Sequence, residues 1–214
     1  KSLLADAELL SLTSKIFREL DLNVIIKVNS RKLLSELMKL NNIKKEQEQE
    51  VLLSLDKLEK VGKNKVIQEL KQKGLQEEQI DSLLKSVTIK KDDQEVLIGL
   101  KEKIKDKETI LELEELFNYL NMFGVKNIKL DLSLARGLNY YTGTIFEVYL
   151  TDLKITSSVA AGGRYDNMIG EFLSSKDQIP SVGISFGLDV ISDALSRKTK
   201  IQKSKTQVYI IPIG

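Results

Sequence analysis

The sequence predicts an α+β fold in which a largely antiparallel sheet is interrupted by an all-helical insertion. Its 214 residues are enough to bury a sizeable core. Apolar stretches typical of β-strands occur in the first and last parts of the chain, and the later ones follow one another without the long crossovers that parallel pairing needs. The stretch between them shows helical periodicity alone.

Residues 1–31 are predicted to be the first part of the main body, a helix that leads into a buried strand. The apolar run at residues 23–28 has the length of a strand. Before it, apolar side chains recur at helical spacing, at Leu9, Leu12, Ile16 and Leu20.

Residues 32–107 are predicted to be the insertion. Lysine and glutamate separate its apolar residues, and it contains no proline. Solvated helix faces explain these lysines at least as well as a contact with nucleic acid. The apolar residues that mark amphipathic helices are Leu33, Leu34, Leu37 and Met38, then Val51, Leu52, Leu55 and Leu58, then Ile80, Leu83 and Leu84.

Residues 108–197 are predicted to be the second part of the body. Thr109 and Glu112 have the spacing of a capping box at the start of a helix that Gly124 can close. Alternating or continuous apolar residues then predict strands at residues 128–132, 144–150 and 157–161.

Residues 198–214 are predicted to be a charged linker followed by the first strand of a further domain. The chain lacks an initiator Met, and residues 207–214 form an apolar stretch with no later segment to pair with. We therefore expect the chain to be part of a longer protein.

Composition excludes several classes of function. The absence of cysteine excludes disulfides, thiolate catalysis and the common structural zinc sites, and the absence of histidine removes the usual general base and metal ligand. With 33 Lys and Arg against 31 Asp and Glu, the net charge of +2 gives no strong field toward nucleic acid. No apolar run approaches the ~20 residues of a membrane span, so we expect a soluble, cytoplasmic protein without a membrane partner.

Two glycine-bearing stretches, residues 134–143 and 160–166, contain the functional signal. Each sets an arginine and tyrosine among glycines. Glycine lets the backbone approach a ligand, arginine offers a fork of donors to carboxylate or phosphate, and tyrosine offers a hydroxyl. The mixture predicts a site for a small polar ligand. The structural alternatives are a surface arginine beside a core tyrosine pair in the first stretch, and a tight turn with an internal Arg164–Asp166 pair in the second.

In their order and spacing, the two stretches resemble the histidine-specific signatures of histidyl-tRNA synthetases. Residues 181–188 are similar to the strand and helix start of the third class II synthetase motif, and the likeness runs from Ala5 to the last strand. The resemblance implies the class II catalytic domain and a histidine–tRNA ligase, which activates histidine with ATP and transfers it to tRNA(His). It also implies Mg²⁺ as a cofactor that binds with ATP, and an anticodon-binding domain that begins within residues 198–214.

By this resemblance, Arg136 is the catalytic residue and contacts both the carboxylate of histidine and the α-phosphate of ATP. A fixed cation between these two anions lowers their repulsion and stabilises charge on the transferring phosphorus. Gly137 and Gly187 are the further ATP-binding or adenylate-binding residues that the resemblance implies, and no residue is expected to bind metal.

Histidine binding is assigned by resemblance to tyrosines and glycines of both stretches, namely Tyr140, Tyr141, Gly162, Gly163 and Tyr165. Tyr141 is expected to hydrogen-bond the substrate imidazole. Because successive side chains of an extended segment point to opposite faces, only one of the tandem tyrosines is expected to face the pocket. The residues expected to brace this site from behind are Thr142, Arg164 and Asp166.

The third motif departs from the family pattern at Val190, where these enzymes have a phosphate-binding arginine. Either Arg197 or another cation compensates, or ATP binding is weaker. The alternative function is therefore a synthetase-like regulatory protein that senses histidine without catalysis. The family's first two motifs would precede Lys1, so we expect an incomplete catalytic domain that is inactive alone, with homodimer contacts mostly outside this chain.

Overall fold

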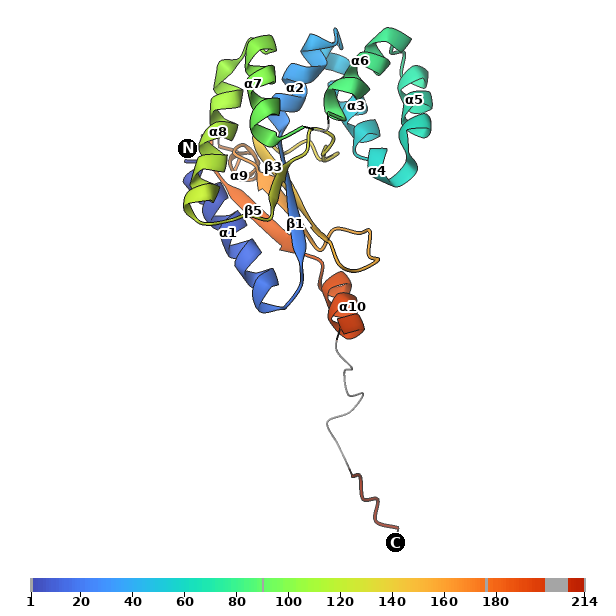
Figure 1. The fold of residues 1–214 in the computed structure, drawn as a ribbon, viewed down its shortest axis with the longest axis vertical. Coiled ribbons are helices and arrows are strands. Elements are labelled where there is room, and N and C mark those ends of the chain that lie inside the picture. Colours follow the sequence, from blue (N-terminus) through green and yellow to red (C-terminus); the bar gives the residue numbers. More distant parts are fainter. Residues whose placement is uncertain (1, 90, 176, 199–207, 214) are drawn as a thin grey trace.

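The computed structural model describes residues 2–89, 91–175, 177–198 and 208–213. A sheet lies in the middle, with α1 and α8 on one side and a layer of shorter helices above it (Figure 1). The sheet has five strands in the order β2–β1–β3–β4–β5. In chain order the strands are β1 (Val24–Ser30), β2 (Ile128–Leu130), β3 (Thr144–Leu150), β4 (Ala160–Arg164) and β5 (Val182–Phe186).

Neighbouring strands of this sheet are antiparallel, except that β1 and β2 are parallel. These two strands flank the predicted insertion, which supplies the long crossover that a parallel pair needs. The α+β fold with a largely antiparallel sheet is therefore confirmed. Several boundaries were wrong, and the largest difference is in the strand predicted at residues 157–161, which instead begins at Ala160 and continues as β4 through Gly162 and Gly163 to Arg164. Pairing with strands on both sides overrides the low strand propensity of glycine.

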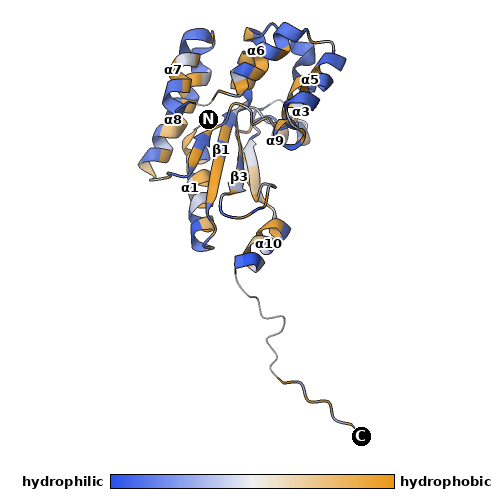
Figure 2. Cartoon of the chain, turned by 45° about the vertical axis from the view of Figure 1, so that its right-hand side comes forward, coloured by the Kyte–Doolittle hydropathy of each residue, from blue (hydrophilic) through white to orange (hydrophobic). Residues whose placement is uncertain are grey.

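Helix α1 (Leu4–Glu19) covers one face of the sheet. Its fully buried Leu10 and Phe17 join a cluster that includes Ile26 of β1 and Phe146 of β3. Figure 2 shows β1 as a strongly hydrophobic strand in the middle of the molecule. On the opposite face of the sheet, Gly163 of the second signature stretch lies against the Tyr141 ring of the first.

The described residues between β1 and α8 are helical, as the insertion prediction requires. They form α2 (Arg31–Leu40), η1 (Lys45–Gln47), α3 (Glu48–Leu55), α4 (Leu58–Val61), α5 (Lys63–Gln72), α6 (Glu77–Val87) and α7 (Asp93–Lys103). Their buried leucines share one cluster with Leu134, Tyr141 and Ile145 of the body. The division into residues 1–31, 32–107 and 108–197 stays a prediction, and this shared cluster joins the helices closely to the body.

Helix α8 (Lys107–Met122) returns the chain to the sheet and packs beside α1. The predicted capping box at Thr109 was wrong. The helix begins three residues earlier, with Asp106 as its N-cap, because the side chain of Asp106 accepts hydrogen bonds from the Glu108 N–H and the Thr109 hydroxyl. Gly124 ends this segment with a positive φ of 71°, as predicted.

Helices α9 (Met168–Phe172) and α10 (Leu188–Lys198) follow β4 and β5. Residues 199–207 and 214, which hold most of the predicted linker and the ends of the predicted last strand, lie outside the described residues. Residues 208–213 are exposed and have no regular secondary structure. Among the described residues, no helix combines the length and apolar character of a membrane span.

Candidate functional site

Arg136 belongs to the first signature stretch, residues 134–143. It follows the buried residues Leu134 and Ala135 and lies in a loop. Its side chain is 18% exposed, and its Nη1 donates to Glu147 Oε1 of β3 at 2.6 Å. Its Cζ lies 5.5 Å from the centre of the Tyr141 ring. Its buried Nε has no hydrogen-bond partner among the described residues. Because a buried donor without a partner is costly, this guanidinium is arranged to donate to something further.

The tandem tyrosines lie together instead of pointing to opposite faces, so that prediction was wrong. Tyr141 is 7% exposed and Tyr140 is 38% exposed, yet their ring centroids are only 4.5 Å apart. The cause is local, since the chain turns at residues 139–140 and is not extended there. The ring of Tyr165 meets Tyr140 edge to face at 6.4 Å. The structure thus brings three predicted site tyrosines into one aromatic group.

The hydroxyl of Tyr141 is held in its protonated form. Burial, followed by the hydrogen bond with Tyr140, raises the pKa of Tyr141 to about 12, although the nearby Arg136 lowers it. A protonated hydroxyl both donates and accepts, which suits a ligand with a donor and an acceptor nitrogen.

Two glycines let these tyrosines lie against the sheet. A Cβ at Gly163 would lie 2.6 Å from the Thr144 carbonyl oxygen and 2.8 Å from the Tyr141 ring. A Cβ at Gly183 of β5 would lie 2.6 Å from the Tyr165 hydroxyl. Gly163 therefore lies beneath the aromatic group, and Gly183, which was not among the predicted site residues, lies beneath Tyr165.

Gly162 has a different neighbour. A Cβ there would lie 2.8 Å from the Phe146 ring, and Phe146 belongs to the cluster under α1. Strand alternation accounts for this, because successive residues of β4 face opposite sides of the sheet. Gly162 is thus needed by the core on the α1 side, whereas its neighbour Gly163 borders the tyrosines.

Arg164 is enclosed by acidic groups. Its side chain is 2% exposed and pairs with Asp6 of α1, while its Nη1 donates to Asp166 Oδ1 at 3.0 Å and its Nη2 to the Ser2 carbonyl at 2.8 Å. Burial lowers the pKa of Arg164, but Asp6 and Asp166 outweigh burial and raise it. Thr142 completes this group, since its hydroxyl accepts from the Asp166 N–H at 3.0 Å.

The remaining predicted residues do not lie in the aromatic group. Gly137 approaches insertion helix α3, where a Cβ would lie 2.7 Å from Leu53 Cδ2. No atom crowds Gly187 in this way, because a Cβ there would make only ordinary van der Waals contacts, at 3.6 Å or more. Val190 is partly buried against the cluster on the α1 side. Arg197, the predicted substitute cation, pairs with Asp193 one turn earlier in α10.

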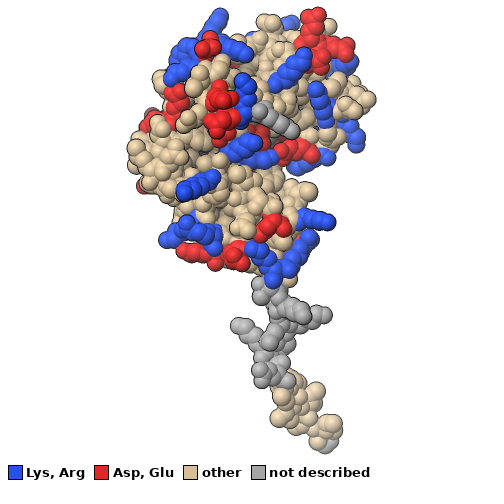
Figure 3. Space-filling view, in the orientation of Figure 1, with Lys and Arg blue, Asp and Glu red and all other residues tan. Residues whose placement is uncertain are grey.

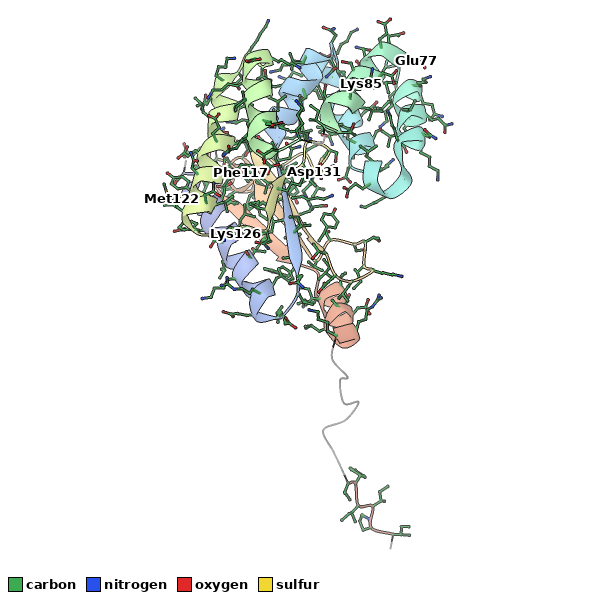
Figure 4. The ribbon with its side chains drawn as sticks, viewed as in Figure 1. Glu77, Lys85, Phe117, Met122, Lys126 and Asp131 are labelled. Carbon is green, nitrogen blue, oxygen red and sulfur yellow. The ribbon has the colours of Figure 1, made fainter. Side chains whose placement is uncertain are left out.

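A polar cavity of about 880 Å³ lies beside Glu147, between the sheet and α4. Lys27 of β1 points into it, pairs with Asp131 at 3.2 Å and with Glu59 of α4, and lies 4.8 Å from the Tyr149 ring centre. Figure 4 labels Asp131 where the sheet meets the helices. Arg136 and the site tyrosines do not line this cavity, but Leu134 and Ala135 of the first signature stretch do, as does Glu147, the partner of Arg136.

Sequence analysis missed the partners of Arg136. The carboxylate of Glu147 accepts from Arg136 on one oxygen and from the Tyr149 hydroxyl on the other. Burial, and then the bond to Glu147, raise the pKa of Tyr149. The available signal was Glu147 itself, the one charged residue in the apolar strand of residues 144–150.

The charges of the described residues are dispersed. Figure 3 shows basic and acidic side chains mixed over the face in view. Within the described ranges, no group of three or more His, Cys, Asp or Glu side chains is placed to hold a metal ion.

Comparison with known proteins agrees with these motifs. A family model described as histidyl-tRNA synthetase matches residues 1–191. Histidine–tRNA ligase 1 of Bacillus cereus (strain ZK / E33L) is 42% identical over an alignment of 225 residues, which covers 100% of this chain and 51% of the relative. The histidine–tRNA ligase of Clostridium tetani is 37% identical over 100% of this chain and 50% of its own length. The chain thus spans about half the length of the curated relatives it matches.

Solved structures show the same fold. The crystal structure of histidyl-tRNA synthetase from Nostoc sp. PCC 7120 superposes with a TM-score of 0.83 at 32% identity, covering 92% of this chain and 48% of that chain. An ATP phosphoribosyltransferase regulatory subunit/histidyl-tRNA synthetase from Bacillus halodurans C has a TM-score of 0.74 at 20% identity over 91% of this chain and 50% of that one. The second likeness is evidence for the fold alone.

Proposed function

The chain belongs to the histidyl-tRNA synthetase family, and from that premise we propose that it is part of a histidine–tRNA ligase. The reaction has two steps: histidine and ATP form histidyl-adenylate, and the histidyl group then passes to tRNA(His). The observation that supports this most strongly is Arg136, which pairs with Glu147, lies beside the Tyr141 ring and, among the described residues, has no partner for its buried Nε.

In the first step, Arg136 is proposed to contact the histidine carboxylate and the α-phosphate together. A carboxylate oxygen forms a bond to the α-phosphorus, the bond from that phosphorus to the bridging oxygen breaks, and pyrophosphate leaves. The buried Nε, which has no partner among the described residues, is a donor that Glu147 does not use. Preorganised donors of this kind stabilise the charge that develops in the transition state.

The aromatic group is proposed to bind histidine. Tyr141, protonated at neutral pH, is assigned to the imidazole, with Tyr140 and Tyr165 as neighbouring walls and Gly163 as the floor. Gly162 is also proposed to border histidine, and Gly137 and Gly187 to border ATP or the adenylate, although Gly162 and Gly137 have close neighbours in the fold as well. Thr142, Arg164 and Asp166 are proposed to brace the site without touching ligand.

The other partners follow from the family. ATP is proposed to enter with Mg²⁺ held largely through its phosphates, and the complete enzyme to be a cytoplasmic homodimer whose contacts lie mostly outside these residues. Contact with tRNA(His) is proposed to be local, because the net charge of +2 and the mixed surface charges provide no broad basic face.

Val190 favours a second candidate, a histidine-sensing regulatory protein without aminoacylation activity. The side chain at this position packs toward the core on the α1 side, and Arg197 is paired with Asp193. Neither supplies the phosphate contact that the family pattern has there. A regulatory protein of this kind binds histidine but does not exchange pyrophosphate into ATP.

The test is pyrophosphate exchange into ATP by the longest natural protein that contains these 214 residues. We expect exchange that depends on histidine and is not supported by other amino acids. Histidine binding by calorimetry without any exchange would favour the regulatory candidate, and absence of both binding and exchange would reject both functions.

A further inference from the structure

We propose that Gln49, in helix α3 of the insertion, is a positioning residue that holds the loop containing Arg136 for adenylate formation. The inference rests on the proposed function. It assigns a role in the first step of the reaction to the helical segment between β1 and α8, which was singled out from the sequence only as an insertion.

The loop that contains Arg136 has little backbone support of its own. Within the described part of the chain, the backbone N–H groups of residues 135–141 donate to no backbone carbonyl. In the same part of the chain, one hydrogen bond reaches the main chain of these residues, in which the Gly137 carbonyl accepts from Gln49 Nε2 at 3.0 Å. The loop is therefore fixed by side chains that pack against it, and Gln49 reaches the residue next to Arg136.

Gln49 is itself held in one orientation. Its Oε1 accepts from Arg31 Nη2 at 2.8 Å. Because arginine only donates, the amide oxygen must face Arg31, and this leaves the NH₂ group to face the Gly137 carbonyl. The backbone N–H of Arg31 also donates to the Gly143 carbonyl at 2.8 Å. Arg31 and Gln49 thus connect the beginning and the end of the first signature.

Packing adds a second constraint at the same point. Leu53, one turn after Gln49 in α3, lies where a Cβ of residue 137 would come within 2.7 Å of its Cδ2. Glycine at position 137 leaves room for the Leu53 side chain beside the Gln49 bond. The loop and α3 therefore touch through packing as well as through the hydrogen bond.

The first test compares Gln49→Ala with Gln47→Ala in the longest natural protein that contains the chain. Gln47 is a matched control, since its Nε2 donates to the Lys73 carbonyl at 3.4 Å, entirely within the insertion. We expect Gln49→Ala to lower kcat for histidine-dependent exchange roughly 10-fold to 10²-fold, as small misplacements of a catalytic group do, with melting temperature equal to that of the control. Equal kcat for the two variants would overturn the proposal.

A double-mutant cycle separates positioning from general damage. If Gln49 acts through Arg136, Gln49→Ala lowers kcat less than about twofold in an Arg136→Ala background. The full single-mutant effect in that background would show that Gln49 acts elsewhere. As a rescue, Gly137→Ala should lower kcat, and Leu53→Ala in the same molecule should restore most of the loss, because it removes the crowding atom.

A third measurement does not depend on activity and so distinguishes failure of this inference from failure of the proposed function. These 214 residues contain no cysteine, so Leu138→Cys, at a residue that is 42% exposed, provides one site for a nitroxide spin label once any cysteine elsewhere in the natural protein is replaced by serine. We expect Gln49→Ala to increase the mobility of the label and Gln47→Ala to leave it unchanged. Identical spectra for both variants would reject the role of Gln49 even if the protein proves to be the ligase.

Discussion

The two signature arginines lie in similar sequence surroundings but in opposite physical situations. Arg164 is 2% exposed and donates to Asp6, Asp166 and a carbonyl. Arg136 is 18% exposed, has Glu147 as its carboxylate partner, and keeps a buried Nε that has no partner in the described part of the chain. An arginine whose donors are already used stabilises the fold, whereas one with free donors in a partly buried site is available to a ligand.

The largest expected effect is on stability at Arg164. Arg164→Met leaves Asp6, which is 0% exposed, as a buried charge without this partner, so we expect a loss of about 3–5 kcal/mol in the free energy of unfolding. Urea unfolding measures it. The control is Arg197→Met, which removes an exposed pair with Asp193 and should cost less than about 0.5 kcal/mol. Equal losses for the two variants would mean that burial does not distinguish these arginines.

The next effect is on the orientation of Arg136. Glu147→Gln keeps the shape of the side chain but removes the charge that aligns the guanidinium, so we expect kcat for exchange to fall about tenfold with little change in stability. Tyr149→Phe removes the hydroxyl that donates to Glu147 and should have a smaller effect in the same direction. Glu95→Gln, at an exposed residue of α7, is the control. An unchanged kcat for pyrophosphate exchange in Glu147→Gln would show that Glu147 has no role in orienting Arg136 for the reaction.

A pH dependence follows from Tyr141, beside Arg136. Its pKa is raised from 10.0 to about 12 in the folded chain, so the unfolded chain loses this proton first as the pH rises. The contribution of this pKa difference to the free energy of unfolding is fully present below about pH 10 and is lost as the pH rises through about 12. Urea unfolding between about pH 9 and 11.5 should therefore show wild type losing stability faster than Tyr141→Phe. Tyr209→Phe, at an exposed tyrosine, should follow wild type, and parallel curves for all three proteins would refute the shift.

The smallest effect is expected at Val190. Val190→Arg supplies a cation where the family pattern has one, and we expect ATP to bind more tightly by roughly tenfold or less, because the valine is partly buried and arginine must turn outward. Calorimetric titration of ATP measures it, with Ser192→Arg at an exposed position of α10 as the control. Tight ATP binding by wild type with no gain in Val190→Arg would show that another cation already occupies the place and would remove the main support for the regulatory candidate.

Local patterns in the sequence were sufficient for part of the regular structure. The sequence predicted β3 at its observed bounds, residues 144–150, and helical periodicity predicted α2, α3 and α6 of the insertion but did not mark α5 or α7. The boundaries that failed depended on tertiary contacts. The glycines of β4 became strand because strands pair on both sides, and α8 begins at Lys107 because the side chain of Asp106 caps it.

The candidate site was only partly predictable. The arginines and tyrosines were found because their types and spacing are unusual, and the brace formed by Thr142 and Asp166 was expected from the same stretch. Asp6 and Gln49 could not be found this way, since they are 158 and 88 residues away from the residues that they hold. Only the folded chain brings such distant partners together.

The most direct test of the central contrast replaces each arginine with lysine, which keeps the charge but loses the planar fork. Exchange kcat and the free energy of unfolding are measured for Arg136→Lys and Arg164→Lys in the longest natural protein that contains the chain. We expect Arg136→Lys to lose at least tenfold in kcat with unchanged stability, and Arg164→Lys to lose stability while its folded molecules keep kcat within about threefold. Full kcat in Arg136→Lys together with a large loss of kcat in folded Arg164→Lys would reverse the assignment and contradict the account.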